Sequence, residues 1–419
     1  MRVKLAKMVS LPFLGLLLLA MPLLGGCGAE EEGTVLVGFI GDFTGVASAT
    51  CNELKKAIDD YLAMAQEEDP IPGADIKLAT YDTRMKYDRV PFGYQDLKGR
   101  GADIFFNFNP IMQGMLIEDH QEDHIPSLSM VSSPTYVGQD WIYSFGVHYP
   151  LEAEAIAHWI VKEWWPDQGE ERAVKIGHVG IHGYGSTDQV SEKLQEMQAS
   201  DDYDFELVEE EGLETTPEWG SEVSALSECD IIIVNCVGPQ AASFVRDAKD
   251  RNYAGKLLGT SMAFLGFWEL VKDAVSPAEL DGTLAIHGHT LWTDKTDGEL
   301  VPFMALVDNM LHTYRESEYD NLRKGTSYMT GVEVGMVLEE AIRNAAEDKT
   351  ADQTWAEAIN AAMQDIHIDK TADGFGEVWE CHDINILHRQ LRVIEYRYPE
   401  DDWYEIRSWE LPPSLQGGG

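Results

Sequence analysis

Short apolar runs alternate with amphipathic stretches along the first third of the chain. The runs are VLVGFIG, DIKLATYD, ADIFFNFN and IPSLSM, at residues 35–41, 75–82, 102–109 and 125–130. Short apolar runs bounded by polar residues are typical of strands that are buried on both faces of a parallel sheet. Between the first two runs, apolar residues recur at helical spacing from Leu54 to Ala65. This alternation predicts an α/β unit with helices on both faces of a parallel sheet.

The same alternation restarts in the middle of the chain. The runs there are VKIGHVGI, YDFELVEE, CDIIIVNCV and KLLGTS, at residues 174–181, 203–210, 229–237 and 256–261. They are separated by helical stretches such as residues 239–252, where Ala242, Val245 and Ala248 share a face. Two similar patterns in succession predict two lobes.

The late segments fit neither lobe alone. Residues 282–292 have the composition of a strand, and residues 327–346 and 353–364 have helical periodicity. Residues 374–398 are interpreted as two strands joined by a polar turn at His382–Asp383. A chain that crosses between the lobes more than once forms a hinged pair, and we therefore expect a ligand cleft between the lobes.

Polar and flexible residues follow several of the predicted strands. They are Gly41–Gly45, Asn107–Pro110, Ser132–Pro134 and Gly183–Gly185. In open parallel sheets, ligands bind at the carboxyl ends of the strands. The hydroxyls, amides and glycine-rich backbone at these ends predict a site for a small polar ligand.

The N-terminus has the features of an export signal. Three cations at positions 2, 4 and 7 precede an apolar stretch at 8–24, which contains two prolines and is too short and broken to span a membrane. Leu24–Cys27 resembles the lipobox of bacterial lipoproteins, in which cleavage before the cysteine leaves it as a lipidated N-terminus. This resemblance implies a signal peptide at 1–26, lipidation of Cys27 and a tether at 27–33. The alternative is an ordinary cleaved signal with an incidental cysteine.

The charge of the chain limits its partners. The formal net charge is -42, and removal of Arg2, Lys4 and Lys7 with the signal makes it -45. Nucleic acid is excluded as an expected partner, because phosphates would be repelled by so acidic a surface. An anionic bilayer would also repel the folded body, so we expect lipid to provide the membrane attachment.

The remaining residues with distinctive chemistry indicate neither an enzyme nor a metal protein. Cys51, Cys229, Cys236 and Cys381 allow three disulfide connectivities, although a strand between Cys229 and Cys236 would hold those two too far apart. His287 and His289 lack a third ligand at useful spacing, so we expect a structural or hinge role, no metal and no cofactor. A hydrolase using Ser132 or Ser186 stays as an alternative, but no G-x-S-x-G motif is present.

Seven fragments, in their shared order, resemble a known family across most of residues 34–398. They are GFIGDFTG, YDT, IPSLSMVSSPTYVGQDWIYSF, HYPLEAEAIAHWI, HVGIHGYG, GPQAASFVRDAKDRNYAGKLLGT and ADGFGEVWECHDI. The family is the type I periplasmic solute-binding proteins, specifically the branched-chain amino acid (Leu/Ile/Val) group served by ABC transporters. The chain resembles the lipoprotein form of this group.

The resemblance implies two doubly wound parallel-sheet lobes joined by a three-crossover hinge that closes over a ligand. Lobe 1 is expected at 34–147 plus 286–367, lobe 2 at 148–285 plus 368–410, and a tail at 411–419. The implied function is to capture a solute outside the cytoplasm and deliver it to an ABC permease, as a monomer held to a membrane by lipid. A sensor with the same fold is the alternative within this class.

Site residues follow from the resemblance position by position. Asn109 and Pro110 stand where the family holds the ligand carboxylate, and Val131–Ser132 match a pair whose second member supplies a hydroxyl. Tyr184 matches an aromatic residue that covers the ligand. The family has two further aromatic residues, which fall near Thr50 and Gly238 in this chain, so neither position matches.

The acidic residue that neutralises an α-ammonium in the family falls near Ser261 or Met262, and neither is acidic. An unpaired ammonium in a dry cleft costs several kcal/mol. Asp42 is a candidate replacement for the acid. Without it, an amide or a carboxylate that lacks an amine, with an aromatic body, fits better than a branched-chain or other hydrophobic amino acid.

Overall fold

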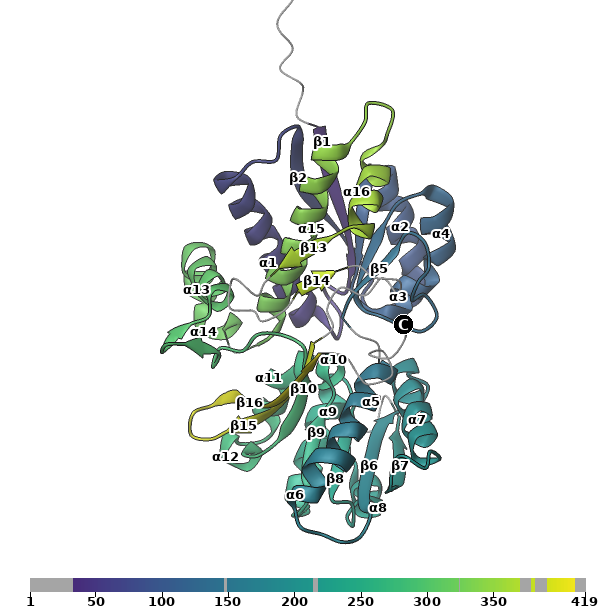
Figure 1. Ribbon diagram of the computed structural model, residues 1–419, viewed down its shortest axis with the longest axis vertical. Helices are drawn as coiled ribbons and strands as arrows, with labels where there is room; N and C mark the ends of the chain where they lie inside the picture. Colours follow the sequence, from purple (N-terminus) through teal and green to yellow (C-terminus); the bar gives the residue numbers. More distant parts are fainter. Residues whose placement is uncertain are drawn as a thin grey trace, which may run out of the picture.

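The computed structural model describes residues 33–146, 149–213, 218–323, 325–369, 378–380 and 390–410. Several predicted features lie outside the described residues: the signal at 1–26, Cys27 and the tether as far as residue 32, Cys381, the turn at His382–Asp383, and the tail at 411–419. The described residues form two lobes, each built on a β-sheet (Figure 1).

Lobe 1 contains a five-stranded parallel sheet in the order β2-β1-β3-β4-β5. The strands are β1 (Gly33–Gly41), β2 (Ala74–Asp82), β3 (Ala102–Asn107), β4 (Ser127–Val131) and β5 (Ile142–Gly146). All of β4 and most of β1 and β3 are buried on both faces, which explains their continuous apolar sequences. The accompanying helices are α1 (Ser48–Glu68), α2 (Val90–Gly99), α3 (Pro110–Met115), α4 (Ile117–Asp123), α13 (Pro302–Tyr314), α14 (Tyr319–Leu322), α15 (Ser327–Asp348) and α16 (Trp355–Gln364).

Lobe 2 contains a seven-stranded sheet in the order β16-β15-β10-β9-β8-β6-β7. The strands are β6 (Val174–Ile181), β7 (Phe205–Gly212), β8 (Ile231–Asn235), β9 (Lys256–Gly259), β10 (Leu284–His287), β15 (Gln390–Arg397) and β16 (Asp402–Glu410). The five from β10 to β7 are parallel, whereas β15 and β16 are antiparallel. The helices are α5 (Tyr149–Trp159), α6 (Trp165–Asp167), α7 (Gly185–Gln198), α8 (Gly220–Ala225), α9 (Pro239–Asp250), α10 (Ser261–Phe264), α11 (Trp268–Ala274) and α12 (Pro277–Leu280). The prediction of an α/β protein with two parallel-sheet lobes is confirmed.

The C-terminal strands differ from the expected arrangement. The two strands expected within 374–398 belong to different sheets: β14 (Val378–Glu380) pairs with β13 (His367–Asp369), and β15 pairs with β10 and β16. The expected lobe boundaries at 285/286 and 367/368 lie inside β10 and β13. The whole of β10 is part of the lobe 2 sheet. One further small sheet joins β11 (Lys295–Thr296) to β12 (Glu299–Leu300).

The small sheet of β13 and β14 lies beside α15 and β5 of lobe 1 (Figure 1). The chain therefore passes between the lobes three times: between β5 and α5, between β10 and α13, and between β14 and β15. On the second passage, His289 faces the buried Glu333 of α15, with Nδ1 2.5 Å from a carboxylate oxygen. The His289 ring also stacks on Phe145 of β5, with ring centroids 5.7 Å apart. His289 therefore joins the crossover to lobe 1, and no group of three potential metal ligands occurs among the described residues.

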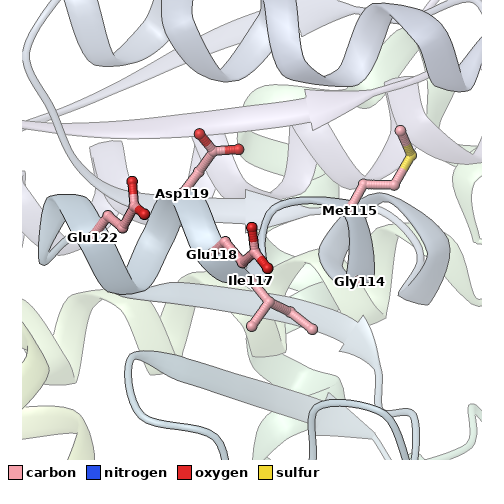
Figure 2. A pocket seen from close by; sticks show the side chains of 6 residues that line it. All are labelled: Gly114, Met115, Ile117, Glu118, Asp119 and Glu122. Atoms are coloured by element: carbon pink, nitrogen blue, oxygen red, sulfur yellow. The ribbon is translucent and has the colours of Figure 1, made fainter.

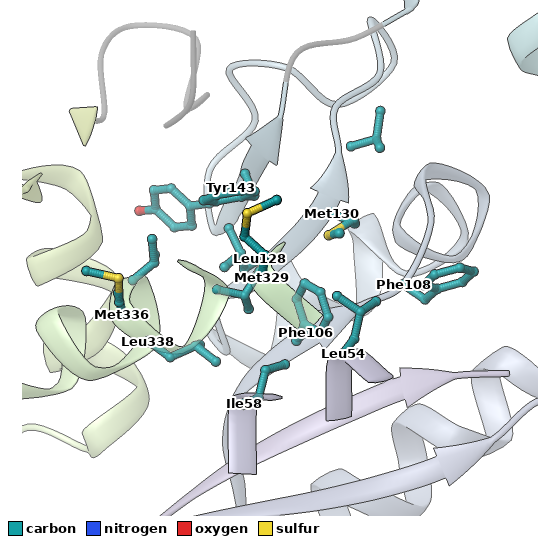
Figure 3. Packing of buried hydrophobic residues seen from close by; sticks show 14 of the residues in the cluster. Leu54, Ile58, Phe106, Phe108, Leu128, Met130, Tyr143, Met329, Met336 and Leu338 are labelled. Atoms are coloured by element: carbon teal, nitrogen blue, oxygen red, sulfur yellow. The ribbon is translucent and has the colours of Figure 1, made fainter. Parts of the chain in front are cut away.

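The core of lobe 1 forms between its sheet and the helix pair α1 and α15. Figure 3 shows Leu54 and Ile58 of α1 beside Phe106 and Leu128 of the sheet, with Met329 of α15 packed against them. A second apolar cluster lies in lobe 2. The cysteines in the described part of the chain, Cys51, Cys229 and Cys236, are buried and free. No helix in that part is long and apolar enough to cross a membrane.

Candidate functional site

A cavity of about 800 Å³ is lined by residues of both lobes. Lobe 1 contributes residues from the loops after β1, β2, β3 and β4, and lobe 2 contributes residues that follow β6, β8 and β9 together with the start of α5. These are the carboxyl ends of parallel strands, as predicted from the sequence. The lobes also meet directly at the Thr50 hydroxyl, which donates to the backbone oxygen of Gly266 at 3.1 Å.

Asn109 and Pro110 both line the cavity at the start of α3. The Asn109 side-chain oxygen accepts a hydrogen bond from the Met112 N–H at 2.9 Å, so this side chain is the N-cap of the helix. Pro110 occupies the first helical turn, where a missing N–H costs nothing. Both residues therefore position the loop as well as contributing to the cavity wall.

At the end of β4, Val131 lines the cavity but Ser132 does not. Ser132 is fully buried, and its hydroxyl has no hydrogen-bond partner among the described residues. Side chains alternate along an extended segment, so Ser133 shares the cavity side with Val131. Hydroxyls reach the cavity wall from Ser133 and Thr135, whose oxygens lie 2.9 Å apart. The period of two in the sequence could have indicated Ser133.

Tyr184 lines the cavity from lobe 2, at the N-cap of α7. The turn before it depends on Gly183, whose φ of +77° is readily adopted only by glycine. Gln189, one turn further along α7, also lines the cavity. Its Oε1 atom is buried and has no hydrogen-bond partner within the described part of the chain.

Gly238 lines the cavity at the N-cap of α9. Its φ of +57° and ψ of -132° lie in a backbone region that residues other than glycine avoid. A Cβ there would lie 3.9 Å from the ring of Phe267, which also lines the cavity. Phe267 thus supplies an aromatic beside Gly238. No local sequence pattern predicts this contact, because Phe267 comes from a separate segment after β9.

Asp42 lies outside the cavity lining. It is fully buried, and its carboxylate accepts hydrogen bonds from the N–H groups of Gly45 at 2.5 Å and Ala47 at 2.8 Å. Asp42 therefore stabilises the loop that presents Val46 and Ala47 to the cavity. Its carboxylate oxygens are occupied by backbone.

Ser261 also lies outside the lining, while nearby Ala263 is part of it. Its N–H and hydroxyl donate to the two carboxylate oxygens of Glu152, at 2.5 and 2.9 Å. Burial raises the pKa of Glu152 to about 7, although the bonds from Ser261 act to lower it. Glu152 was not predicted as a site residue, because it comes from α5 and carries no local motif.

Among the described residues that line the cavity, there is no Asp, Glu, Lys, Arg or His. Acidic side chains occur next to it, in a smaller pocket of about 320 Å³ that shares Gly114, Met115 and Ile117 with the cavity. Figure 2 shows Glu118, Asp119 and Glu122 of α4 around this second pocket. The arrangement separates a charged outer surface from an uncharged cavity.

Solved structures with the same fold include proteins from three bacteria. A branched chain amino acid ABC transporter protein from Thermus thermophilus, with bound valine, is 17% identical with a TM-score of 0.70, covering 91% of this chain and 96% of its own. A fatty acid ABC transporter substrate-binding protein from Thermomonospora curvata is 17% identical with a TM-score of 0.74, covering 90% and 92%. A solute-binding protein of an ABC transporter from Rhodopseudomonas palustris BisB5, in complex with 3,4-dihydroxy benzoic acid, is 14% identical with a TM-score of 0.71, covering 91% and 99%. At these identities the likeness shows the fold.

Among curated proteins, no significant sequence match was found. The sequence itself matches the family described as "Periplasmic binding protein" over residues 34–397. This range includes the lobe 1 sheet from its second residue, every strand of the lobe 2 sheet except β16, and every segment that lines the cavity. The chain belongs to the periplasmic binding protein family.

Proposed function

We propose that this protein is the solute-binding component of an ABC importer, which captures a small molecule in the cavity between its lobes and delivers it to a permease. The observation that carries this proposal is the cavity itself, whose wall is divided between the strand ends of the two lobes. A ligand bound there touches both lobes at once. The similar structures described as ABC transporter proteins support the role in import.

The proposed mechanism is closure of the lobes around the solute. A ligand shifts the protein towards a closed form only if it makes better contacts with that form than with the open one. Tyr184 and Phe267 of lobe 2 and Phe108 of lobe 1 are the groups that closure would bring onto a solute from opposite sides. The permease would then recognise the closed form.

We further propose an extracytoplasmic location and a lipid anchor at Cys27. Export fits the family, and the anchor rests on the cationic, apolar and small-residue regions that precede this cysteine in sequence. Several acyl chains, at about 0.8 kcal/mol per buried methylene, are sufficient for stable attachment. Cys27→Ser should release the protein from membranes, and pelleting of the variant with membranes would count against acylation.

An enzymatic role has less support. Of the two serines considered as nucleophiles, Ser132 is fully buried outside the cavity lining and only Ser186 lines it. Purified protein should show a higher melting temperature with its solute, and the solute should be recovered unchanged. Chemical conversion of the stabilising compound would contradict the receptor function and favour an enzyme.

A further inference from the structure

The cavity wall differs from the rest of the protein in charge. One residue in four along the chain is Asp, Glu, Lys or Arg. At that frequency, about six of the 25 described residues that line the cavity would be charged, and none of these 25 is. The wall is formed by apolar, aromatic, hydroxyl and amide side chains together with glycines. A ligand that fills this cavity meets no side chain of opposite charge among these described residues.

Two buried carboxylates near the cavity are already engaged by the protein. Asp42 is held by the Gly45 and Ala47 amides, and Glu152 by the amide and hydroxyl of Ser261. Both carboxylates are buried behind the wall. An ammonium group in the cavity would lose its water without gaining a counter-charge from the described lining residues, which is strongly unfavourable.

A carboxylate ligand would also lack a charged partner. No Lys or Arg lines the cavity within the part of the chain that the structure describes, and the net charge of -42 repels anions approaching the protein. The N-termini of α7 and α9 lie at the wall and give a carboxylate its most favourable position. A carboxylate is therefore the charged head group that competes most closely with a neutral one for this cavity.

The cavity favours an apolar body with a flat face. Aromatic rings line it from both lobes, namely Tyr87 and Phe108 from lobe 1 and Tyr149, Tyr184 and Phe267 from lobe 2. Rings on opposite walls can stack on an aromatic ligand or cover a branched one. A volume of about 800 Å³ is within the range of cavities that hold drug-sized ligands.

One polar atom in the wall indicates the head group. The buried Oε1 of Gln189 has no hydrogen-bond partner among the described residues, and a buried acceptor without a donor is unfavourable. A ligand N–H or O–H that reaches this atom would satisfy it. The hydroxyls of Ser133 and Thr135, across the cavity in lobe 1, can serve the other side of the same head group.

We propose that the cavity selects an uncharged ligand with an aromatic or branched apolar body and one amide head group that donates a hydrogen bond to Gln189. This inference rests on the proposed function, because it assigns the solute class of the same site. It distinguishes the protein from a receptor for zwitterionic amino acids.

Two matched series of compounds test the ligand class. They are 3-phenylpropanamide, 3-phenylpropanoate and phenylalanine, and 4-methylpentanamide, 4-methylpentanoate and leucine. Titration calorimetry at pH 7.5 on the full mature protein should give the amide of at least one series a Kd ten or more times lower than that of its acid and its amino acid. Tightest binding of an acid or an amino acid would overturn the ligand class and leave the receptor function intact. Binding of none of the six would also overturn the ligand class, whereas the receptor function would be contradicted only if the stabilising solute were chemically converted.

A substitution within the wall provides an independent test. Gln189→Glu keeps the shape of the side chain and introduces a carboxylate, so affinity for phenylalanine or leucine should rise fivefold or more. Gln198→Glu is the matched control, because Gln198 lies on the same helix, α7, and is exposed to solvent. Unchanged amino acid affinity in Gln189→Glu, or an equal gain in both variants, would contradict the placement of Gln189 at the head group.

Discussion

Single residues around the cavity have two distinct roles. Asp42 and Glu152 use their carboxylates to hold backbone and hydroxyl groups behind the wall, whereas Tyr184 and Gln189 lie in the wall itself. Sequence alone does not separate these roles, since a polar residue after a strand can face either the loop or the ligand. The distinction leads to different expectations for stability and for binding.

Glu152 should make the stability of the protein depend on pH. Burial raises its pKa from an ordinary value of 4.5 to about 7, so the folded protein holds this proton more tightly than the unfolded chain does. Its contribution to stability is therefore greatest below pH 4.5 and is lost as the pH rises to about 7. In urea unfolding, the free energy of unfolding of Glu152→Gln relative to the wild type should rise by on the order of 2 kcal/mol between pH 4.5 and pH 8.

Glu192→Gln is the control for Glu152, because Glu192 lies on α7 and is exposed. Its unfolding free energy should follow that of the wild type at every pH. A constant difference between Glu152→Gln and the wild type across this range would show that Glu152 does not titrate as described.

Tyr184 should contribute directly to affinity. A ring that covers a small solute contributes more than about 1 kcal/mol, so Tyr184→Ala should weaken binding of the best ligand at least fivefold in calorimetry. Tyr184→Phe keeps the ring and should stay within about twofold of the wild type. Unchanged affinity in Tyr184→Ala would refute its position over the ligand.

At the scale of elements, the contact between α1 and α15 determines the packing of lobe 1. A Cβ at Gly331 of α15 would lie 2.6 Å from the Ala57 Cβ and 2.7 Å from the Leu54 backbone oxygen. Alanine improves helix propensity by about 1 kcal/mol over glycine, but overpacking against backbone costs about 1–3 kcal/mol. Gly331→Ala should therefore lower the free energy of unfolding in urea.

Gly99→Ala provides the matched comparison for Gly331→Ala. Gly99 is the last residue of α2, and a Cβ there meets no atom within 4 Å. This variant should be neutral or slightly more stable than the wild type. If both variants were stabilised equally, the helices would not be as closely packed as the structure indicates.

The elements differ in how well their sequences predicted them. Strands buried on both faces, such as β1, β4, β6 and β8, follow from continuous apolar runs. The edge strands β5 and β16 were missed. β16 contains charged residues at several positions, because an antiparallel edge strand has a face in contact with solvent.

The cavity residues show the same limit. Asn109, Pro110, Val131, Tyr184 and Gly238 were proposed from sequence and line the cavity, whereas Asp42, Ser132 and Ser261 do not. Gln189 and Phe267 were not anticipated. Their place in the wall depends on how helices and loops from separate segments converge, and no local pattern records that convergence.

For the whole molecule, the three passages between the lobes and the divided cavity wall imply a hinge motion. His289, Glu333 and Phe145 lie at the passages, and the Thr50 contact to Gly266 lies where the lobes meet. A solute that touches both walls should hold the lobes together. The excess negative charge spread over the protein opposes compaction only weakly at physiological salt, where surface charges are screened within about 8 Å.

Small-angle X-ray scattering of the mature protein, with and without a saturating solute identified by calorimetry, tests whether the lobes close over the ligand. The radius of gyration should fall when the solute is added, and it should recover when the solute is removed by dialysis. An unchanged radius of gyration at full occupancy would contradict closure as the means by which this protein holds its ligand.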